Sequence, residues 1–211
     1  MKEIFKNLPG IKQILEVKRE LMMIRNQTEK HSRILQEQFI LQLKNSPKYS
    51  DPRHLVHFES QVYSQNGEDG IISEIFNRIG TTNRNFVEIG TSNGLENNTA
   101  LLVLEGWKGI WVEGNEIANM EAATHWAEAI NESRLKTVTA MVTAENIQTL
   151  LNDNKVPMDL DLISLDIDRN TFHVFQKLVE HRPRLLVIEY NGNFPKTSQW
   201  LIDYKADEGW D

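Results

Sequence analysis

Residues 85–115, NFVEIGTSNGLENNTALLVLEGWKGIWVEGN, constrain the fold more than any other part of the chain. Two short apolar strands are predicted here, one ending with Glu88 and Gly90 and the other at Glu113. A loop follows the first strand, and Gly94 in that loop lets the backbone turn closely against a ligand. This order of strand, glycine-bearing loop, helix and strand is typical of α/β folds that bind nucleotides.

The spacing of the acidic residues predicts which part of a nucleotide is bound. In such folds an acidic side chain just past the second strand accepts hydrogen bonds from ribose hydroxyls, roughly 20 residues after the first strand. Glu113 follows Glu88 by 25 positions and fits this role, although it could also be a solvated acid at a strand end. The glycine pattern is G-x-x-x-G, not G-x-G-x-x-G. It therefore favours a nucleoside ligand without a pyrophosphate and disfavours a dehydrogenase or a nucleotide-sugar enzyme.

Strands and helices are predicted to alternate from residue 68 onward. The predicted helices are 68–79, 97–105, 118–129, 144–152 and 171–180, and the predicted strands are 85–89, 109–112, 136–142, 160–166 and 184–189. Such alternation predicts a Rossmann-like, doubly wound, mostly parallel sheet with helices on both faces. Ligands of these sheets bind at the carboxyl ends of the strands, where Glu88, Glu113, Asp166 and Glu189 are expected.

Five segments, in collinear order, resemble the FkbM-type branch of the class I S-adenosylmethionine-dependent methyltransferases. They are SQNGEDGIISEIF (64–76), FVEIGTSNG (86–94), GWKGIWVEGN (106–115), DLISLDID (161–168) and PRLLVIEYNGNF (183–194). The resemblance implies a class I methyltransferase fold with S-adenosyl-L-methionine as cofactor. It does not identify the substrate.

The same resemblance implies roles for individual residues. The methionine part of the cofactor would be held by Glu88, Gly90 and Gly94, its ribose by Glu113, its amino-acid end by Gln65, and its adenine by Val142 and Thr143. The segment around Gln65 is equally compatible with a helix cap, and apolar positions such as Val142 are often plain core.

Oxygen-bearing side chains follow the two last predicted strands. Asp166 and Asp168 come after the first, and Glu189 and Asn191 after the second. Adjacent strands lie about 4.8 Å apart, so these groups can reach one hard cation, and the arrangement resembles magnesium-dependent O-methyltransferases. Alternatively, Asp166 and Asp168 orient the cofactor amine or cap the next helix. Arg169 could pair with the carboxylates and compete with Mg²⁺.

The catalytic residues are predicted to be His173, as general base, and Asp166. His173 follows Asp168 by five residues on the next predicted helix, and imidazole titrates near neutral pH. A lone histidine between apolar neighbours is more often packed or at the surface. His54 and His57 are weaker candidates that would have to close over the site.

Residues 1–48 are predicted to form a separate helical segment that begins after Pro9-Gly10. Apolar residues at a and d positions of a heptad form one seam, interrupted by Thr28 and His31: Ile14, Val17, Leu21, Ile24 and Leu35. A coiled coil that joins copies of the chain and a single helix docked on its own domain or a partner are both compatible with this pattern. Binding to a membrane is disfavoured, because the remaining apolar residues make no single face. The turn-rich segment 46–52 (SPKYSDP) marks the boundary to a body at 53–211.

Charge bears on partners and localisation. The 211-residue chain has a net charge of −7, but residues 1–48 carry ten Lys/Arg against five Asp/Glu, while the other 163 carry thirteen against twenty-five. A body with a net charge of −12 is expected to bind a small-molecule or glycan acceptor and no nucleic acid. No apolar run approaches the roughly 20 residues of a membrane span and no signal-peptide core is present, so a cytoplasmic location is expected. Without cysteine, any metal must take oxygen or imidazole ligands.

Together these observations predict an S-adenosylmethionine-dependent methyltransferase that acts on a hydroxyl of a saccharide or secondary metabolite, with Mg²⁺ as a candidate aid. Sheets of this class usually carry seven strands and only five are recognised, so the methyltransferase domain at 53–211 is expected to be C-terminally incomplete. The alternative is a degenerate methyltransferase-like module that acts in binding or assembly through its N-terminal helix.

Overall fold

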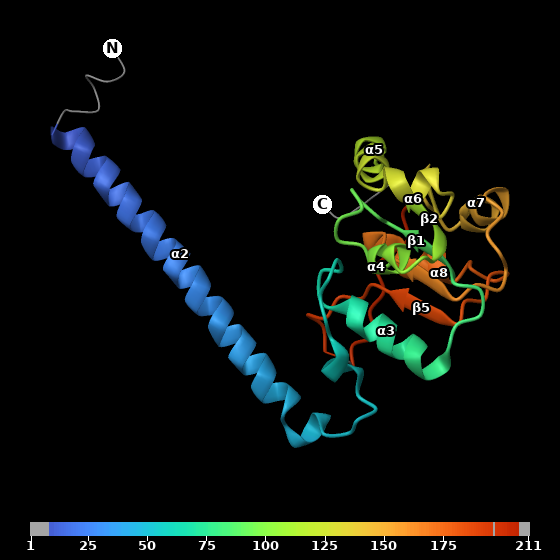
Figure 1. Cartoon of the computed structure of the whole chain (residues 1–211), viewed down its shortest axis with the longest axis horizontal. Coiled ribbons are helices and arrows are strands. Elements are labelled where there is room, and N and C mark those ends of the chain that lie inside the picture. The colour runs from blue at the N-terminus through green and yellow to red at the C-terminus, as the bar shows by residue number, and fades with distance from the viewer. Residues whose placement is uncertain (1–8, 196, 207–211) are drawn as a thin grey trace, which may run out of the picture. The chain divides into compact units, whose positions relative to one another are not determined.

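The structure, a computed structural model, describes residues 9–195 and 197–206. The chain divides into two compact units between His57 and Phe58. In the first unit, α2 (Pro9–Lys44) is one continuous helix of 36 residues (Figure 1). Two short 3-10 turns, η1 (Pro47–Tyr49) and η2 (Leu55–Phe58), follow it. The predicted N-terminal helical segment is confirmed.

The second unit contains one five-stranded sheet. Its strands are β1 (Asn85–Ile89), β2 (Lys108–Glu113), β3 (Leu135–Thr139), β4 (Leu162–Leu165) and β5 (Leu185–Ile188). The order is β3-β2-β1-β4-β5, and every neighbouring pair is parallel. The order reverses at β1, which puts a crevice at the carboxyl ends of β1, β2 and β4. The predicted Rossmann-like, doubly wound parallel sheet is confirmed.

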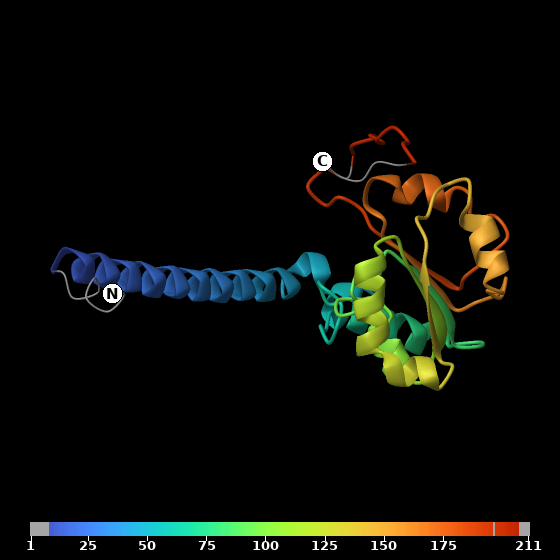
Figure 2. The same ribbon diagram turned by 90° about the horizontal axis from the view of Figure 1, so that it is seen from above.

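Helices cover both faces of this sheet. They are α3 (Glu68–Ile79), α4 (Ala100–Leu104), α5 (Glu116–His125), α6 (Ala127–Asn131), α7 (Ile147–Asp153) and α8 (Thr171–Phe175), with the 3-10 turn η3 (Asp168–Asn170) before α8. Figure 2 shows α7 and α8 on one side of the sheet and α5 and α6 on the other.

Alternating strand residues build a separate core on each face, because successive side chains of a strand point to opposite sides. Phe86, Trp111 and Leu162 pack with α3 to α6 in one core. Val87 and Ile163 belong to the other, with residues of α7 and α8. Since β1 and β4 are buried on both faces, most of their residues are apolar and they show no strict alternation of apolar and polar residues, which is typical of central parallel strands.

Most predicted elements differ from the observed ones by one to three residues at an end, and three elements differ more clearly. The helix expected at 118–129 is two helices, since Trp126 has φ −108° and ψ 22° and interrupts the helical backbone. The first of them starts early because the Ala118 N–H donates to Asn115 Oδ1 (3.1 Å), an N-cap bond. The strand predicted to reach Val142 ends at Thr139, and the helix predicted to reach Glu180 ends at Phe175, where tight turns replace it.

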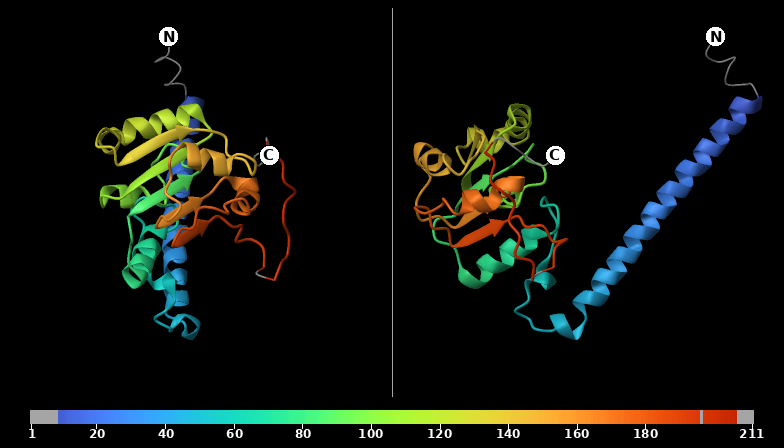
Figure 3. Two further views of the ribbon diagram at one scale, coloured as in Figure 1. Left: turned by 90° about the vertical axis from the view of Figure 1, so that its right-hand side faces the viewer. Right: turned by 180° about the vertical axis from the view of Figure 1, so that it is seen from behind.

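The chain after β5 turns back toward α8 without forming a helix or strand in its described part (Figure 3, red). Hydrogen bonds from several parts of the second unit hold this C-terminal segment, which we define as residues 202–206. His173 Nε2 donates to the Ile202 carbonyl (2.8 Å), and Asn170 Nδ2 donates to the Lys205 carbonyl (2.7 Å). The hydroxyl of Tyr204 accepts the Ala144 N–H (3.0 Å). None of the helices among the described residues has the length and hydropathy needed to span a bilayer.

Candidate functional site: a cleft at the carboxyl edge of the sheet

Two cavities open where the strands of the second unit end. The first, about 740 Å³, is lined mainly by polar residues that include Gln65, Glu68, Glu88, Thr91, Asn97, Asp166 and Glu189. The second, about 700 Å³, is lined by residues that include Glu113, Asn115, Met141, Val142, Ile167 and Asp168. Gln65, Gly90, Ser92 and Asp166 line both, so the two cavities are halves of one cleft. Both volumes lie within the range of about 300–1,000 Å³ that is common for small-molecule sites.

Gly90 sits at the centre of the cleft and cannot carry a side chain. Its φ is +84°, and a Cβ atom there would lie 1.6 Å from the Asp166 carbonyl oxygen. The segments that follow β1 and β4 can therefore approach this closely only if residue 90 is glycine. It brings the loop after β1 next to the acidic residues that follow β4.

Glu88 is buried, with 4% of its surface exposed, and its carboxylate supports the loop after β1. One oxygen accepts the Asn98 N–H (2.9 Å), and the other accepts the Thr99 N–H (3.0 Å) and the Thr99 hydroxyl. Burial raises the pKa of Glu88 to about 7, although these hydrogen bonds act in the opposite direction. Glu88 lines the first cavity as expected, with both carboxylate oxygens engaged by the loop.

Glu113 ends β2 and lines the second cavity. Its Oε2 accepts the Ser92 N–H (2.6 Å), and its Oε1 accepts the Asn115 N–H (2.8 Å). These bonds fix the carboxylate between the loops that follow β1 and β2. Each carboxylate oxygen has a second lone pair, so Glu113 can still accept a hydrogen bond from a ligand hydroxyl.

Gln65 faces both cavities, and a neighbouring carboxylate shapes the segment that carries it. Asp69 Oδ2 accepts the backbone N–H groups of residues 62–64, each at 2.8 Å. Gln65 Nε2 donates to Glu96 Oε2 (3.0 Å) in the loop after β1. The predicted cofactor residues Gln65 and Val142 thus lie at the cleft, as do Gly90 and Glu113.

Gly94 and Thr143 do not line either cavity. A Cβ atom on Gly94 would meet the Trp111 ring at 2.8 Å, so this glycine permits close packing in the core and not an approach to a ligand. Thr143 belongs to the start of α7: its N–H donates to Asn146 Oδ1 (2.8 Å), and its hydroxyl accepts the Asn146 N–H (3.3 Å). These two bonds close the turn that precedes α7 and account for the position of Thr143.

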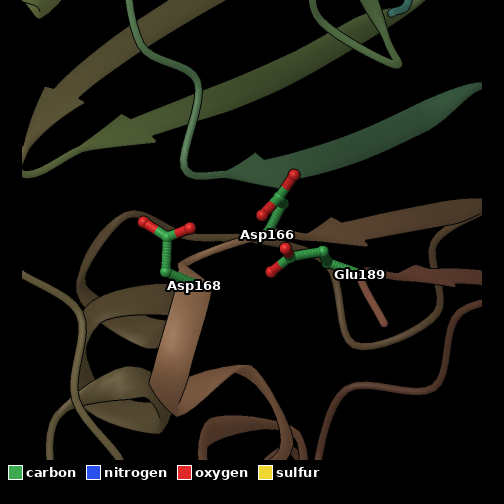
Figure 4. A group of neighbouring side chains, drawn as sticks. All are labelled: Asp166, Asp168 and Glu189. Atoms are coloured by element: carbon green, nitrogen blue, oxygen red, sulfur yellow. The ribbon is translucent and has the colours of Figure 1, made fainter. Parts of the chain in front are cut away.

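The carboxylates of Asp166, Asp168 and Glu189 form the acidic cluster of the cleft. One ligand oxygen from each can be chosen so that all three lie within 4.8 Å of one another (Figure 4). Asp168 has φ +56°, a left-handed conformation that aspartate tolerates better than most residues. The cluster therefore depends on a backbone geometry that the D-x-D motif supplies.

Two carboxyl groups of the acidic cluster have raised pKa values. Burial raises the pKa of Glu189 to about 7, helped by the charge of Asp166 and a hydrogen bond between the two carboxyl groups. Burial also raises the pKa of Asp166, and the charge of Asp168 adds to the rise. All three residues are nevertheless open to solvent. Carboxylates that repel one another at an open cleft are suited to binding a cation.

Other predicted site residues lie elsewhere. Asn191 Oδ1 accepts the Asn193 N–H (3.0 Å) within a turn, and Asn191 lines neither cavity. His173 donates to the Ile202 carbonyl and stacks near the Tyr204 ring, with centroids 5.2 Å apart, so it holds the C-terminal segment. Arg169 Nη2 donates to the Asp203 carbonyl (3.3 Å).

The two histidines near the unit boundary contact a tyrosine of the first unit. His54 packs its ring against Tyr49, with centroids 5.8 Å apart, and His57 contacts the Tyr49 carbonyl. Their expected closure over the cleft stays a prediction.

Two buried polar residues of the cleft were not predicted from the sequence. Thr91 and Asn97 are 3% and 4% exposed and line the first cavity. The hydroxyl of Thr91 and Nδ2 of Asn97 have no hydrogen-bond partner of normal geometry among the described residues. Buried polar atoms without partners are costly, so these two groups are candidates to bind a ligand. Their place in the TSNGLENN loop, next to Gly90, was the only signal available from the sequence.

Comparison with known proteins finds no match among protein-family models or curated protein sequences. Solved structures are similar at low identity. An O-methyltransferase from Bacillus cereus in complex with SAH is 20% identical over 68% of this chain and 60% of its own, with a TM-score of 0.44. A putative caffeoyl-CoA O-methyltransferase from Staphylococcus aureus is 16% identical over 69% and 67%, with a TM-score of 0.45. A putative O-methyltransferase from Klebsiella pneumoniae is 18% identical over 54% and 49%, with a TM-score of 0.41. The chain thus spans less than two thirds of the Bacillus and Klebsiella proteins.

Proposed function

We propose that this chain is an FkbM-type, S-adenosylmethionine-dependent methyltransferase that acts on a hydroxyl of a small molecule or glycan. One observation carries the proposal: Asp166 lines both the cavity with the chemistry of a nucleoside site and the cavity that contains Glu189, and with Asp168 and Glu189 it forms an acidic cluster where the two cavities join. A cofactor with its nucleoside in the second cavity would extend its amino-acid end into the first, and an acceptor in the remaining part of the first cavity would meet it beside Asp166. The collinear motifs of the chain support the same reading.

The residues of the second cavity fit the nucleoside part of the cofactor. Glu113 offers carboxylate oxygens to the ribose hydroxyls, while Met141, Val142 and Ile167 give an apolar surface for the adenine ring. Gly90, at the junction, leaves room for the sulfur-bearing part of the cofactor near Gln65. The unpartnered groups of Thr91 and Asn97 would hydrogen-bond to its amino-acid end.

The residues of the acidic cluster fit a divalent cation. Three carboxylates within 4.8 Å provide the oxygen ligands that Mg²⁺ prefers, and Mg²⁺ usually takes one or two carboxylates and keeps several waters. Asp166, Asp168 and Glu189 would hold the ion. When bound, a divalent cation lowers the pKa of a nearby hydroxyl and so makes a sugar or alcohol a better nucleophile.

The chain itself contributes position and charge to methyl transfer. The cofactor supplies an electrophilic methyl group on a positively charged sulfur. The fixed carboxylate of Glu113 would hold the ribose in one orientation, and Gly90 sets how closely the cofactor approaches the acidic cluster. An acceptor held over Asp166 and Glu189 would face the methyl group, and such alignment is a large part of the rate enhancement in two-substrate reactions. Asp166 lies where it can accept the proton that the acceptor hydroxyl loses.

The proposal is tested by calorimetric titration of the full chain with S-adenosylhomocysteine. We expect binding, and we expect Glu113→Ala to weaken it roughly 10- to 100-fold, since hydrogen bonds to a charged group contribute about 1.5–3 kcal/mol. Glu113→Gln, which retains an acceptor for one loop N–H, should weaken it less. The matched control Glu121→Ala removes an exposed carboxylate of α5 and should leave the affinity unchanged.

Absence of binding in the wild-type chain would contradict the proposal and favour a methyltransferase-like module that acts in binding or assembly. Titration with magnesium chloride tests the metal part separately. We expect a heat of Mg²⁺ binding for the wild-type chain and no such heat for Asp168→Asn. The control Asp153→Asn, which changes an exposed carboxylate of α7, should keep the heat of binding. If the wild-type chain gives no heat, the acidic cluster does not bind Mg²⁺, and if both variants behave like the wild type, Asp168 does not hold the ion.

A further inference from the structure

Helix α2 presents an unusual amount of exposed apolar surface for its length. Within the described part of the first unit, the five seam residues are between 54% and 68% exposed: Ile14, Val17, Leu21, Ile24 and Leu35. An isolated helix in water gains little stability from propensity alone, and most helical stability in proteins comes from packing of an apolar face. Helix α2 therefore needs a partner.

The positions of the seam residues indicate what that partner is. With Ile14 at position a, residues 14, 21, 28, 35 and 42 fall at a and residues 17, 24, 31 and 38 at d; the apolar ones lie at 14, 17, 21, 24 and 35, with the 3.5-residue period of a coiled coil. A helix that docks on a globular surface commonly shows a wider apolar stripe with a 3.6-residue period. The a/d seam of residues 14–35 favours another copy of the same helix, and the exposed residues Met22, Met23 and Ile40 lie outside it.

A parallel, in-register pair matches every layer of this seam. Each residue of the seam then faces its own equivalent on the other helix, so the polar positions Thr28, His31, Gln38 and Gln42 also form layers of like residues. The Thr28 hydroxyl donates to the Ile24 carbonyl (2.9 Å), so it can lie in a layer without an unpaired donor. The polar layers would thus specify register.

Antiparallel pairs match less well. An overlap centred between Leu21 and Ile24 puts Ile14 opposite His31 and Val17 opposite Thr28. An overlap that matches Ile14 with Ile24 leaves Leu35 without a seam partner in residues 9–44. Every such arrangement buries fewer apolar layers than the parallel one.

Residues that flank the seam complement one another across a parallel pair, in which position g of one helix faces position e of the next heptad on the other. Glu20 at g would face Arg25 at e, and Ile34 at g would face Phe39 at e. Arg25 also bonds Glu29 of its own helix through Nε (2.8 Å), and its guanidinium has further N–H groups for Glu20. No g–e pair in residues 13–39 brings like charges together.

From this geometry we propose that α2 pairs with α2 of a second copy of this chain as a parallel, in-register, two-stranded coiled coil. The pairing buries the seam and brings the C-terminal ends of the two α2 helices to the same end of the coil. It is independent of the chemistry of the cleft.

The natural absence of cysteine makes the test direct. Light scattering of the full chain should give twice the mass of one 24.4-kDa chain. The single variant Val17→Cys should form a covalent dimer on mild oxidation, because equivalent d positions meet only in a parallel, in-register pair. The control Asn26→Cys, at the outer f position, should remain uncrosslinked. Leu21→Glu should reduce the mass to one chain, whereas Met23→Glu, off the seam, should not.

Other outcomes overturn the proposal in distinguishable ways. A mass of one chain for the wild type would exclude self-association, and a monomer that sediments with anionic phospholipid vesicles would assign α2 to a membrane surface. A mass of two chains without the Val17→Cys cross-link would exclude the parallel register. Three or four copies would exclude the two-stranded form.

Discussion

At the scale of single residues, the close contact at Gly90 determines whether the cleft can form. Gly90→Ala should lower the stability of the folded chain by more than left-handed strain alone, because its Cβ would lie 1.6 Å from the Asp166 carbonyl oxygen. Gly106→Ala is the matched control, since Gly106 has φ +85° and no atom within 4 Å of its Cβ position. We expect about 1–2 kcal/mol of destabilisation at Gly106 and clearly more at Gly90, measured by urea denaturation.

An equal loss of unfolding free energy in the two glycine variants would show that the segments that follow β1 and β4 can move apart at little cost. The cleft would then not depend on the contact between Gly90 and Asp166.

A second residue-scale prediction concerns Glu88 and pH. Its pKa is raised from 4.5 to about 7, so the folded chain binds more protons than the unfolded chain between these values. The resulting stabilisation is fully present below pH 4.5 and is lost as pH rises through 7, by at most about 3 kcal/mol. We therefore expect the unfolding free energy of the wild type to fall relative to that of Glu88→Gln as pH rises from 5 to 8. Denaturation of both chains across this range measures the difference.

The exposed carboxyl of Glu105 gives the control, since Glu105→Gln should follow the wild type across this range. A constant difference between wild type and Glu88→Gln would mean that Glu88 is ionised throughout, and that its hydrogen bonds with Asn98 and Thr99 outweigh its burial.

Residues at strand ends could be placed from the sequence, and residues that depend on loops could not. Glu113, Asp166 and Glu189 lie at the cleft because parallel strands end at one edge of the sheet, whatever the loops do. His173 was expected there from its distance along the chain to Asp168. It instead donates to Ile202, a contact between residues 29 positions apart that no local pattern reveals.

At the scale of elements, the C-terminal segment is an irregular stretch held by side chains of η3 and α8 and by the loop that precedes α7. Tyr204 links it to the start of α7, since its hydroxyl accepts the Ala144 N–H and donates to Glu145. Tyr204→Phe leaves that N–H without its acceptor, at a cost of about 1 kcal/mol. We expect chymotrypsin to cleave residues 190–201 roughly fivefold faster in this variant, as the segment opens more often.

Tyr190→Phe is the control for this experiment, because Tyr190 is 85% exposed and the variant keeps a chymotrypsin site. Unchanged cleavage in Tyr204→Phe would show that the bonds to His173 and Asn170 suffice to hold the segment.

Element types followed from the sequence more reliably than element ends. The bounds of α3 and β1 agree with their prediction, because Gly80 ends the helix and the apolar run 86–89 is short. The helix expected at 118–129 is broken because the indole of Trp126 turns inward to donate to the Gly94 carbonyl (2.8 Å). Apolar periodicity does not reveal such a break, since Trp126 would occupy the same face in a continuous helix.

At the scale of the whole molecule, the two units differ in charge and in what determines their structure. The sheet of the second unit is specified by burial on both faces, and its topology could be predicted. The long helix of the first unit could also be predicted, but the apolar pattern left open whether it pairs with another copy or docks on a different surface. Residues 1–48 carry a net charge of +5 and the rest of the chain carries −12. The coil proposed for α2 would join two copies, and their two acidic second units would repel each other.

The loop that follows β1 is joined at both ends to a pair of buried indoles. Trp126 donates to the Gly94 carbonyl, and Trp111 donates to the Thr99 hydroxyl (2.8 Å), while the two rings stand edge to face with centroids 5.2 Å apart. Any ligand that rearranges this loop must alter the polarity around these chromophores. The protein thus carries an intrinsic optical reporter, and its ultraviolet emission can be followed to detect occupancy of the cleft without a dye or label.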